Sequence, residues 1–263
     1  MAGGTWMSQN KVQPGVYINT KSSGNLSASV GEKGVVAIAE PLSWGPCEVI
    51  QTIIPGEDLT PYIGYDVTNE KALFLKEMMK GSDTTPGPIK ILLYRPKGTG
   101  GVKASGTIGA LSVTALYEGI RGNDITMIVQ EDPDTGGTYV VSTVVDGRTV
   151  DEQTVTALSE LSANAWVTFS GTGNTFTETA GTALSGGVDP TVANADYSAF
   201  LTALEKYTFD IVVYDGTESV VIEAYASFVK RISERVGRKC QAVMAGAEDS
   251  NTEWVISAGN GVK

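Results

Sequence analysis

The residues best placed to do chemistry are Tyr214 and Asp215, which follow an apolar run and precede a long amphipathic segment. Open α/β sheets bind ligands where strands end and helices begin, so a carboxylate here is a candidate general acid or base. A lone aspartate at such a position is more commonly a turn residue or the start of a helix. An α/β enzyme that uses Asp215 on an unknown substrate therefore stays an alternative interpretation.

The chain contains no histidine. This removes the Ser-His-Asp and Cys-His nucleophile systems, the commonest general base and the usual imidazole metal sites. Any enzyme built on this sequence would have to work with carboxylates, lysine or tyrosine. We predict that the chain has no catalytic residues, no cofactor and no metal site.

Two further patterns resemble ligand sites but lack part of what the ligand needs. The glycine-rich segment 96–101 follows an apolar run, but no helix pattern opens behind it, as phosphate binding requires. Asp132 and Asp134 resemble the start of a calcium loop, yet Thr143 stands where the twelfth, acidic ligand belongs. We predict a flexible crossover at the first segment and a hairpin turn at the second.

A group of cations stands out in a chain whose formal net charge is −11. Its members are Lys230, Arg231, Arg235, Arg238 and Lys239. Helical spacing predicts that Arg231, Arg235 and Arg238 share one face. This basic stripe is either a solvated face that complements the helix dipole or a docking surface for an acidic partner. The negative net charge argues against non-specific binding of nucleic acid.

A strand–helix–strand unit at 208–246 must position both Asp215 and the basic stripe. Residues 209–214 and 240–246 read as strands, and apolar residues between them recur at the spacing of a helix that buries one face. Gly237 is the expected stop of that helix. Such a unit implies parallel strands joined by a right-handed crossover. Residues 25–97, which read as strand, strand, helix and strand, complete the same α/β fold.

The composition changes after residue 97 to β-branched runs that are separated by Gly, Asp and Asn turns. Among them, Asp146-Gly147 is the strongest signal for a two-residue hairpin. We predict strands at 105–116, 125–130, 139–145, 149–155 and 166–169. The fold class that follows is an α/β core domain, a mixed sheet flanked by helices, formed by 25–97 and 189–263. A β-rich domain, 98–188, is inserted into it.

Residues 1–24 form a flexible N-terminal arm in this interpretation. A Pro-Gly turn within it precedes alternating β-branched and aromatic residues, which together are Pro14, Gly15, Val16, Tyr17 and Ile18. The run is too short to make its own sheet. It is either an edge strand of the same chain or a strand that is added to a neighbouring subunit.

Cys47 and Cys240 lie far apart among apolar neighbours, and we predict buried free thiols. No apolar run approaches about eighteen residues, and the N-terminus lacks the pattern of a secretory signal. We therefore expect synthesis in the cytoplasm and no transmembrane helix. A parallel sheet should continue past Gly246, so we also expect the C-terminal part of the fold to be truncated.

Several separated segments together resemble a known family. They are MAGGTW and PGVYI near the N-terminus, LSWGP at 42–46, YEGIRGNDITMIV at 117–129 and LSGGVDP at 184–190. In their order and spacing they resemble the sheath proteins of contractile phage tails, including those of Gram-positive phages, defective prophages and phage-tail bacteriocins. The resemblance covers the whole chain, although members of that family continue well past the position of Lys263.

The resemblance implies a structural subunit, not an enzyme, that polymerises around a tail tube and contracts to drive the tube through a cell envelope. It implies arms that exchange strands between subunits, carried here by Val16, Tyr17 and Ile18. The basic stripe would dock on the tube or on a neighbouring subunit. A glycan-binding surface protein stays a further alternative.

The implied partners are other sheath subunits in a helical polymer, the tail tube protein, and the baseplate and tail terminator proteins. Neither nucleic acid nor insertion into a membrane is expected. The subunit would be made in the host cytoplasm and assembled into a phage tail or an extracellular phage-tail-like particle.

Overall fold

A computed structural model describes residues 34–250 and 252–259. The predicted arm strand, Pro14, Gly15, Val16, Tyr17 and Ile18, lies outside these described residues. In the part of the chain that the structure describes, the strands form one six-stranded sheet, one four-stranded sheet and one three-stranded sheet. No helix among the described residues is long and apolar enough to cross a membrane.

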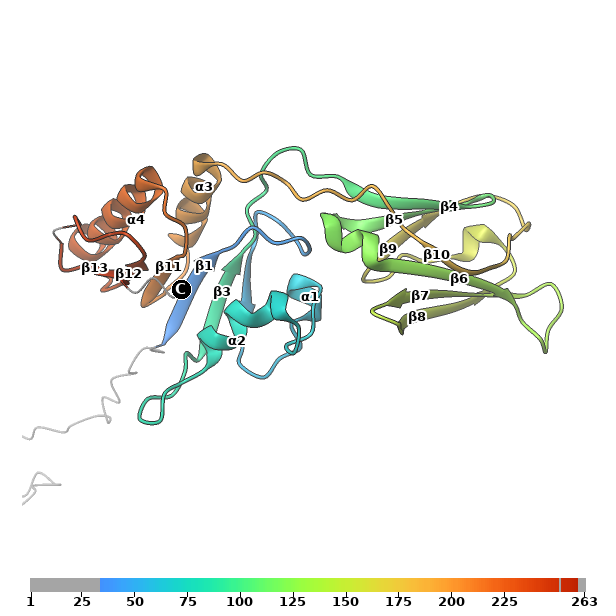
Figure 1. The fold of residues 1–263 in the computed structure, drawn as a ribbon, viewed down its shortest axis with the longest axis horizontal. Coiled ribbons are helices and arrows are strands. Elements are labelled where there is room, and N and C mark those ends of the chain that lie inside the picture. The colour runs from blue at the N-terminus through green and yellow to red at the C-terminus, as the bar shows by residue number, and fades with distance from the viewer. Residues whose placement is uncertain (1–33, 251, 260–263) are drawn as a thin grey trace, which may run out of the picture. The chain divides into compact units, whose positions relative to one another are not determined.

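The six-stranded sheet combines strands from both ends of the described chain (Figure 1). Its strand order is β13-β12-β11-β1-β3-β2, and every neighbouring pair is parallel except β2 with β3. The strands are β1 (Val35–Ala39), β2 (Ile50–Ile53), β3 (Lys90–Tyr94), β11 (Ile211–Tyr214), β12 (Gln241–Met244) and β13 (Val255–Ser257). The sheet is therefore mixed, as the sequence predicts.

Helices cover both faces of this sheet because side chains alternate along its central strands. Val35, Ala37 and Ala39 of β1 belong to the core that packs against α3 (Asn194–Leu204) and α4 (Ser219–Arg231). Ile38 instead faces the core beneath the short helices of the other face. Those helices are α1 (Thr60–Ile63), the 3₁₀ turn η1 (Glu70–Ala72) and α2 (Leu73–Met79).

The helix ends follow the capping residues that the sequence supplies. The side chain of Asn69 accepts a hydrogen bond from the backbone N of Lys71 at 2.9 Å, which caps η1. At the other end of the chain, α4 passes into the π-helical turn η4 (Ile232–Val236) and ends at Gly237, whose φ is 78°. Only glycine adopts this left-handed conformation at little cost, so the predicted helix stop is confirmed.

The middle of the chain forms a β-sandwich with a single apolar core between its two sheets. Their strand orders are β10-β6-β7-β8 and β4-β5-β9. The bounds are β4 (Lys103–Ile108), β5 (Leu111–Glu118), β6 (Ile125–Glu131), β7 (Tyr139–Val145), β8 (Arg148–Val155), β9 (Val167–Ser170) and β10 (Thr179–Ala183), with 3₁₀ turns η2 (Ile120–Asp124) and η3 (Leu158–Glu160).

The hairpin between β7 and β8 turns at Asp146 and Gly147, with φ of 51° and 73°, as the dipeptide predicts. The single strand expected at 105–116 is wrong: β4 and β5 form a hairpin that turns at Gly109. The chain enters and leaves the sandwich side by side, through the antiparallel bridges Thr99–Thr191 and Val102–Val188. The domain boundaries given above stay predictions.

Candidate functional site

The loop at 42–46, which follows β1, places its tryptophan inside the β-sandwich. Trp44 is 1% exposed and belongs to the sandwich core. Its ring lies edge-on to Tyr117, with 5.2 Å between ring centroids, and tilted against Trp166 at 4.8 Å. Gly45 is needed beside it, because its φ is 102° and a Cβ there would overlap the carbonyl oxygen of Tyr62. An aromatic side chain from the α/β part thus completes the core of the sandwich.

Arg95 follows β3 and is 2% exposed. Its Nε donates to the carbonyl of Leu42 at 2.8 Å, its Nη1 to that of Gly45 at 2.5 Å and its Nη2 to that of Glu118 at 2.8 Å. Burial lowers the pKa of Arg95, but a guanidinium stays charged at neutral pH. One side chain therefore connects the six-stranded sheet, the loop at 42–46 and the end of β5.

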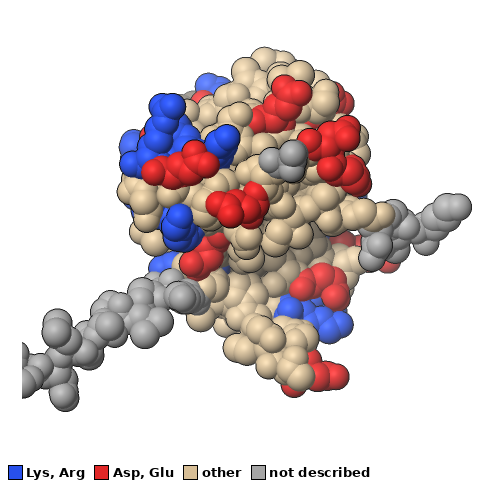
Figure 2. Space-filling view, turned by 90° about the vertical axis from the view of Figure 1, so that its left-hand side faces the viewer, with Lys and Arg blue, Asp and Glu red and all other residues tan. Residues whose placement is uncertain are grey.

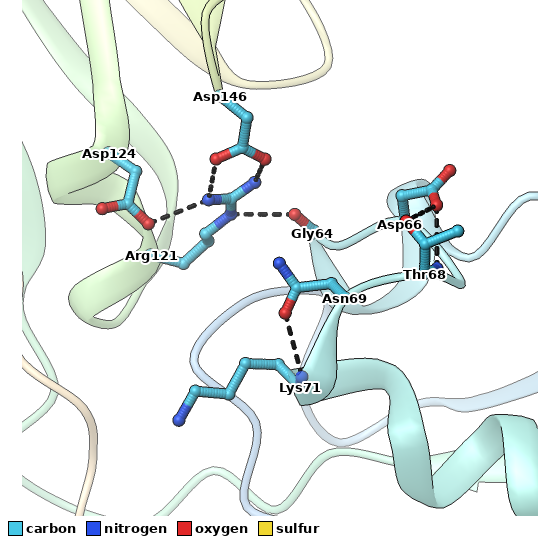
Figure 3. Close-up of polar contacts among 8 residues, drawn as sticks. All are labelled: Gly64, Asp66, Thr68, Asn69, Lys71, Arg121, Asp124 and Asp146. Carbon is cyan, nitrogen blue, oxygen red and sulfur yellow. Dashed lines mark hydrogen bonds and ion pairs between the residues drawn. The ribbon is translucent and has the colours of Figure 1, made fainter.

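Arg121, in η2, makes a second connection and is also 2% exposed (Figure 3). Its Nε donates to the carbonyl of Gly64, just after α1, at 2.8 Å. Its Nη1 donates to Asp124 at 2.8 Å, and both Nη atoms bind the carboxylate of Asp146 at 2.9 and 2.6 Å. The guanidinium also lies 4.2 Å from the centroid of the Tyr65 ring. The hydrogen bonds from Arg121 lower the pKa of Asp146.

Further polar contacts in the same region involve the segment through which the chain leaves the sandwich. The side chain of Asn123 exchanges two hydrogen bonds with the backbone of Gly187, at 3.0 and 2.8 Å. The carboxylate of Asp189 accepts from the backbone N of Ile120 at 2.8 Å and from the hydroxyl of Ser43 at 3.0 Å. The segments 42–46, 117–124 and 184–190, which carry the sequence resemblance, therefore meet in three dimensions. We call this meeting point, with Arg95, the joint.

A cavity of about 800 Å³ lies beside Arg121 at the edge of the joint. Its lining includes Asp66 and Arg148. Asp66 already accepts hydrogen bonds from the backbone N and the hydroxyl of Thr68, at 2.8 and 2.7 Å. Among residues 34–250 and 252–259, no group of three or more His, Cys, Asp or Glu side chains could hold a metal ion. Physically, the joint links the α/β part to the sandwich through buried hydrogen bonds and an aromatic contact.

Asp215, singled out by the sequence, lies next to a carboxyl group that sequence reasoning missed. Glu40 follows β1 and Asp215 follows β11, and these strands are parallel neighbours in the sheet. Burial, the charge of Asp215 and a hydrogen bond with Asp215 raise the pKa of Glu40 to about 8. No signal in the sequence pairs the two residues, because their proximity depends on the order of strands in the sheet.

Tyrosines surround this carboxyl pair. Burial, followed by the nearby Tyr214, Asp215 and Glu40, raises the pKa of Tyr197 to about 12. Among the described residues, the hydroxyl of Tyr225 and the Oε2 atom of Glu40 are buried without a hydrogen-bond partner. The group is a partly buried glutamate beside an exposed aspartate, with tyrosines around them.

The basic stripe is only partly available to a partner. Arg231 forms an ion pair with Glu205, Arg238 donates to the carbonyls of Tyr207 and Glu205 at 2.7 and 2.9 Å, and Lys239 lies 4.5 Å from the centroid of the Trp254 ring. Since Gly237 ends the helix, Arg238 does not lie on the helical face that spacing assigned to it. Lys230 and Arg235 are exposed. Both cysteines are free, and Cys240 is buried, as predicted; Cys47 is only partly buried.

We expect Gly119→Ala to lower the free energy of unfolding by at least about 2 kcal/mol. Gly119 has a φ of 127°, and a Cβ there would overlap the carbonyl of Ser43 across the joint. Gly56→Ala is the matched control, because Gly56 also has a positive φ, 97°, but has open space around it. Its loss should be about 1 kcal/mol. Urea unfolding measures both variants, and equal losses would show that the joint tolerates the added methyl group.

Comparison with known proteins matches two consecutive parts of the chain to models of one family. Residues 99–189 match a family model described as the phage tail sheath protein beta-sandwich domain. Residues 191–263 match the phage tail sheath protein central domain. The whole chain is 33% identical to the phage-like element PBSX protein XkdK of Bacillus subtilis strain 168, and 34% identical to the uncharacterized protein YqbK of the same strain.

Two solved structures share the fold. A sheath tail protein from Desulfitobacterium hafniense is 39% identical, with a TM-score of 0.82 over 94% of this chain and 56% of that chain. A sheath tail protein from Listeria innocua is 32% identical, with a TM-score of 0.72 over 86% of this chain and 50% of that chain. The chain spans 59% of the length of each curated relative from Bacillus subtilis. It belongs to the phage tail sheath protein family.

Proposed function

We propose that this chain is a structural, non-enzymatic subunit that polymerises around a tail tube and contracts to drive the tube through a cell envelope. The observation that carries the proposal is the joint. Arg95, Arg121 and Trp44 are fully buried there, and each contacts both the α/β part and the β-sandwich. In this proposal the domains are 25–97 with 189–263, and an inserted domain, 98–188.

The physical argument is one of stiffness. Separating the two parts would leave buried guanidinium groups without their carbonyl and carboxylate partners, which costs several kcal/mol for each group. It would also expose the ring of Trp44 to water. A subunit with such a joint rotates as a near-rigid body when its lattice rearranges, so movement is concentrated between subunits.

In this proposal, the arms keep neighbouring subunits linked while the subunits move. In the proposal, Val16, Tyr17 and Ile18 form a strand that adds to a neighbour's sheet. The six-stranded sheet ends in β13, whose Ile256 is 45% exposed, and an edge strand is the place where such an addition occurs. The resulting polymer would also contact the tail tube, baseplate and tail terminator proteins, in a phage tail or an extracellular tail-like particle.

Electron microscopy of truncated chains tests the arm. We expect the full chain to form sheath-like polymers and a chain without residues 1–20 to form none, because the exchanged strand is gone. Deletion of residues 1–10 is the matched control, since it shortens the same end but keeps Val16, Tyr17 and Ile18. Polymers that form equally well without residues 1–20 would exclude the arm as the link.

A further inference from the structure

The two ends of α4 carry opposite charge. From Ser219 to Val236 the helix and its last turn extend about 25 Å, at roughly 1.5 Å per residue. Exposed cations gather at its C-terminal end and exposed carboxylates at its N-terminal end, and each end also carries an exposed valine. Figure 2 shows Lys and Arg side chains gathered on one part of the face that includes α4, with Asp and Glu side chains beside and across from them.

We define the basic end as Lys206, Lys230 and Arg235, together with Val236 and Tyr207. All five are exposed, Val236 by 52%, and in the part of the chain that the structure describes the three cations have no ion-pair partner. The hydrogen bonds from Arg238 to the segment that follows α3 hold Lys206 and Tyr207 beside η4. Glu234 is the one exposed carboxylate on η4, so the local charge stays positive.

We define the acidic end as Glu218, Glu223, Glu248 and Asp249, with Val220 in the first turn of α4. The four carboxylates are exposed and Val220 is exposed by 61%. The loop after β12 lies beside the first turns of α4, because a Cβ at Gly246 would be 4.0 Å from Ile222. None of these carboxylates has an ion-pair partner among the described residues.

The two ends complement each other in charge, and each combines charged side chains with an exposed apolar one, as protein interfaces do. The chain is strongly acidic overall, so its basic end attracts the surface of another copy. Two different patches that fit each other give a heterologous contact, and such contacts repeat into rings or helical filaments instead of closing as a dimer.

We propose that the basic end of α4 in one copy docks, head to tail, on the acidic end of α4 in a second copy of this chain. Opposite charges bring the two surfaces together and fix their orientation. As a contact within a sheath the inference rests on the proposed function. As a contact between two copies it does not, because it needs neither the arm nor contraction.

Charge reversal at each end tests the contact. The first variant carries Lys230→Glu and Arg235→Glu, and the second carries Glu223→Lys and Glu248→Lys. Sedimentation velocity of the full chain at low salt should show self-association that weakens as salt screens the charges. Each variant alone should associate at least about tenfold more weakly, because like charges then face each other. A chain with all four reversals should recover the association of the wild type.

Mixing the two variants gives the sharpest result. In the mixture the intact basic end of the second variant faces the intact acidic end of the first, and the two reversed ends also face each other with opposite charge. The mixture should therefore recover an association that neither variant shows alone, with the two variants alternating. Lys71→Glu with Lys76→Glu on the opposite face is the control and should associate like the wild type, since both lysines are exposed on η1 and α2.

Two outcomes would overturn the inference: wild-type chain that stays monomeric at low salt, or reversal variants that associate as well as the wild type. If polymers form by electron microscopy and resist charge reversal, the docking contact is wrong and the proposed function stands. If the mixture recovers association but electron microscopy of the wild type shows no sheath-like polymer, the contact is supported and the proposed function fails.

Discussion

Replacing Trp44 with alanine is expected to lower the free energy of unfolding by about 4 kcal/mol, the cost of removing a large buried aromatic side chain from a packed core. The side chain lies against Tyr117 and Trp166, so its loss leaves a cavity lined by rings that cannot close it. Because Trp44 belongs to the loop after β1, the same change also weakens the hold of the α/β part on the sandwich. Urea unfolding followed by circular dichroism measures the loss.

A matched tryptophan separates this effect from the loss of any aromatic ring. Trp254 is only partly buried and packs at the margin of the core beneath α4. We expect Trp254→Ala to cost about 1–2 kcal/mol, and Trp44→Phe to cost less than Trp44→Ala because it keeps a ring in place. A loss in Trp44→Ala no greater than that in Trp254→Ala would show that the joint does not depend on this contact.

The second large effect is on pH dependence, through Glu40. In the folded chain its pKa is raised from 4.5 to about 8, first by burial and then by Asp215. Between these pH values the native state holds a proton that the unfolded chain has released, so the free energy of unfolding falls as pH rises through this window. At about 1.4 kcal/mol per pKa unit, the fall is of the order of 4–5 kcal/mol.

Glu40→Gln should remove that dependence, because an amide keeps the hydrogen-bonding shape without a titrating proton. We expect the variant to match the wild type near pH 5 and to be more stable by several kcal/mol near pH 9. Glu70→Gln, at an exposed position in η1, is the control and should keep the wild-type profile. Parallel profiles for the wild type and Glu40→Gln would contradict the assignment of this proton to Glu40.

Local turn chemistry was the most predictable part of the fold, but it did not reveal what the turns contact. The dipeptide Asp146-Gly147 predicts its hairpin because both residues tolerate positive φ. Its bond to Arg121 is invisible at that level, since the partner lies in η2 and reaches the turn only after the sandwich has formed. Arginine is also a residue that sequence patterns assign to the surface, which hides both Arg95 and Arg121.

One error, and one feature that the sequence does not reveal, have the same physical origin, a pattern read without its tertiary context. The β-branched run around Gly109 reads as one strand, although the glycine, at φ of 59°, reverses the chain between β4 and β5. The burial of Trp44 could not be predicted either, because a tryptophan between a serine and a glycine carries no periodic signal. Its burial depends on a second part of the fold that is distant in sequence.

The sequence prediction for the basic stripe also contained a conflict that the structure removes. A helix that stops at Gly237 cannot place Arg238 on its face, so one of the two predictions had to be wrong. The glycine is the stronger signal, because a residue in the left-handed conformation ends a helix. The periodic spacing of arginines cannot extend the helix past such a residue.

The paired entry and exit of the β-sandwich have a consequence for how such a subunit evolves. Thr99 pairs with Thr191 and Val102 pairs with Val188, so the two ends of the sandwich segment lie side by side. For the α/β part, the whole segment between them is therefore geometrically equivalent to a tight turn. The entropy of closing a long loop grows only slowly with its length. A domain of another size or fold, provided its ends also meet, fits this position without changing the strand register of the six-stranded sheet. The sandwich is therefore the part of the subunit most free to diversify, limited mainly by the residues that Arg121 and Trp44 contact.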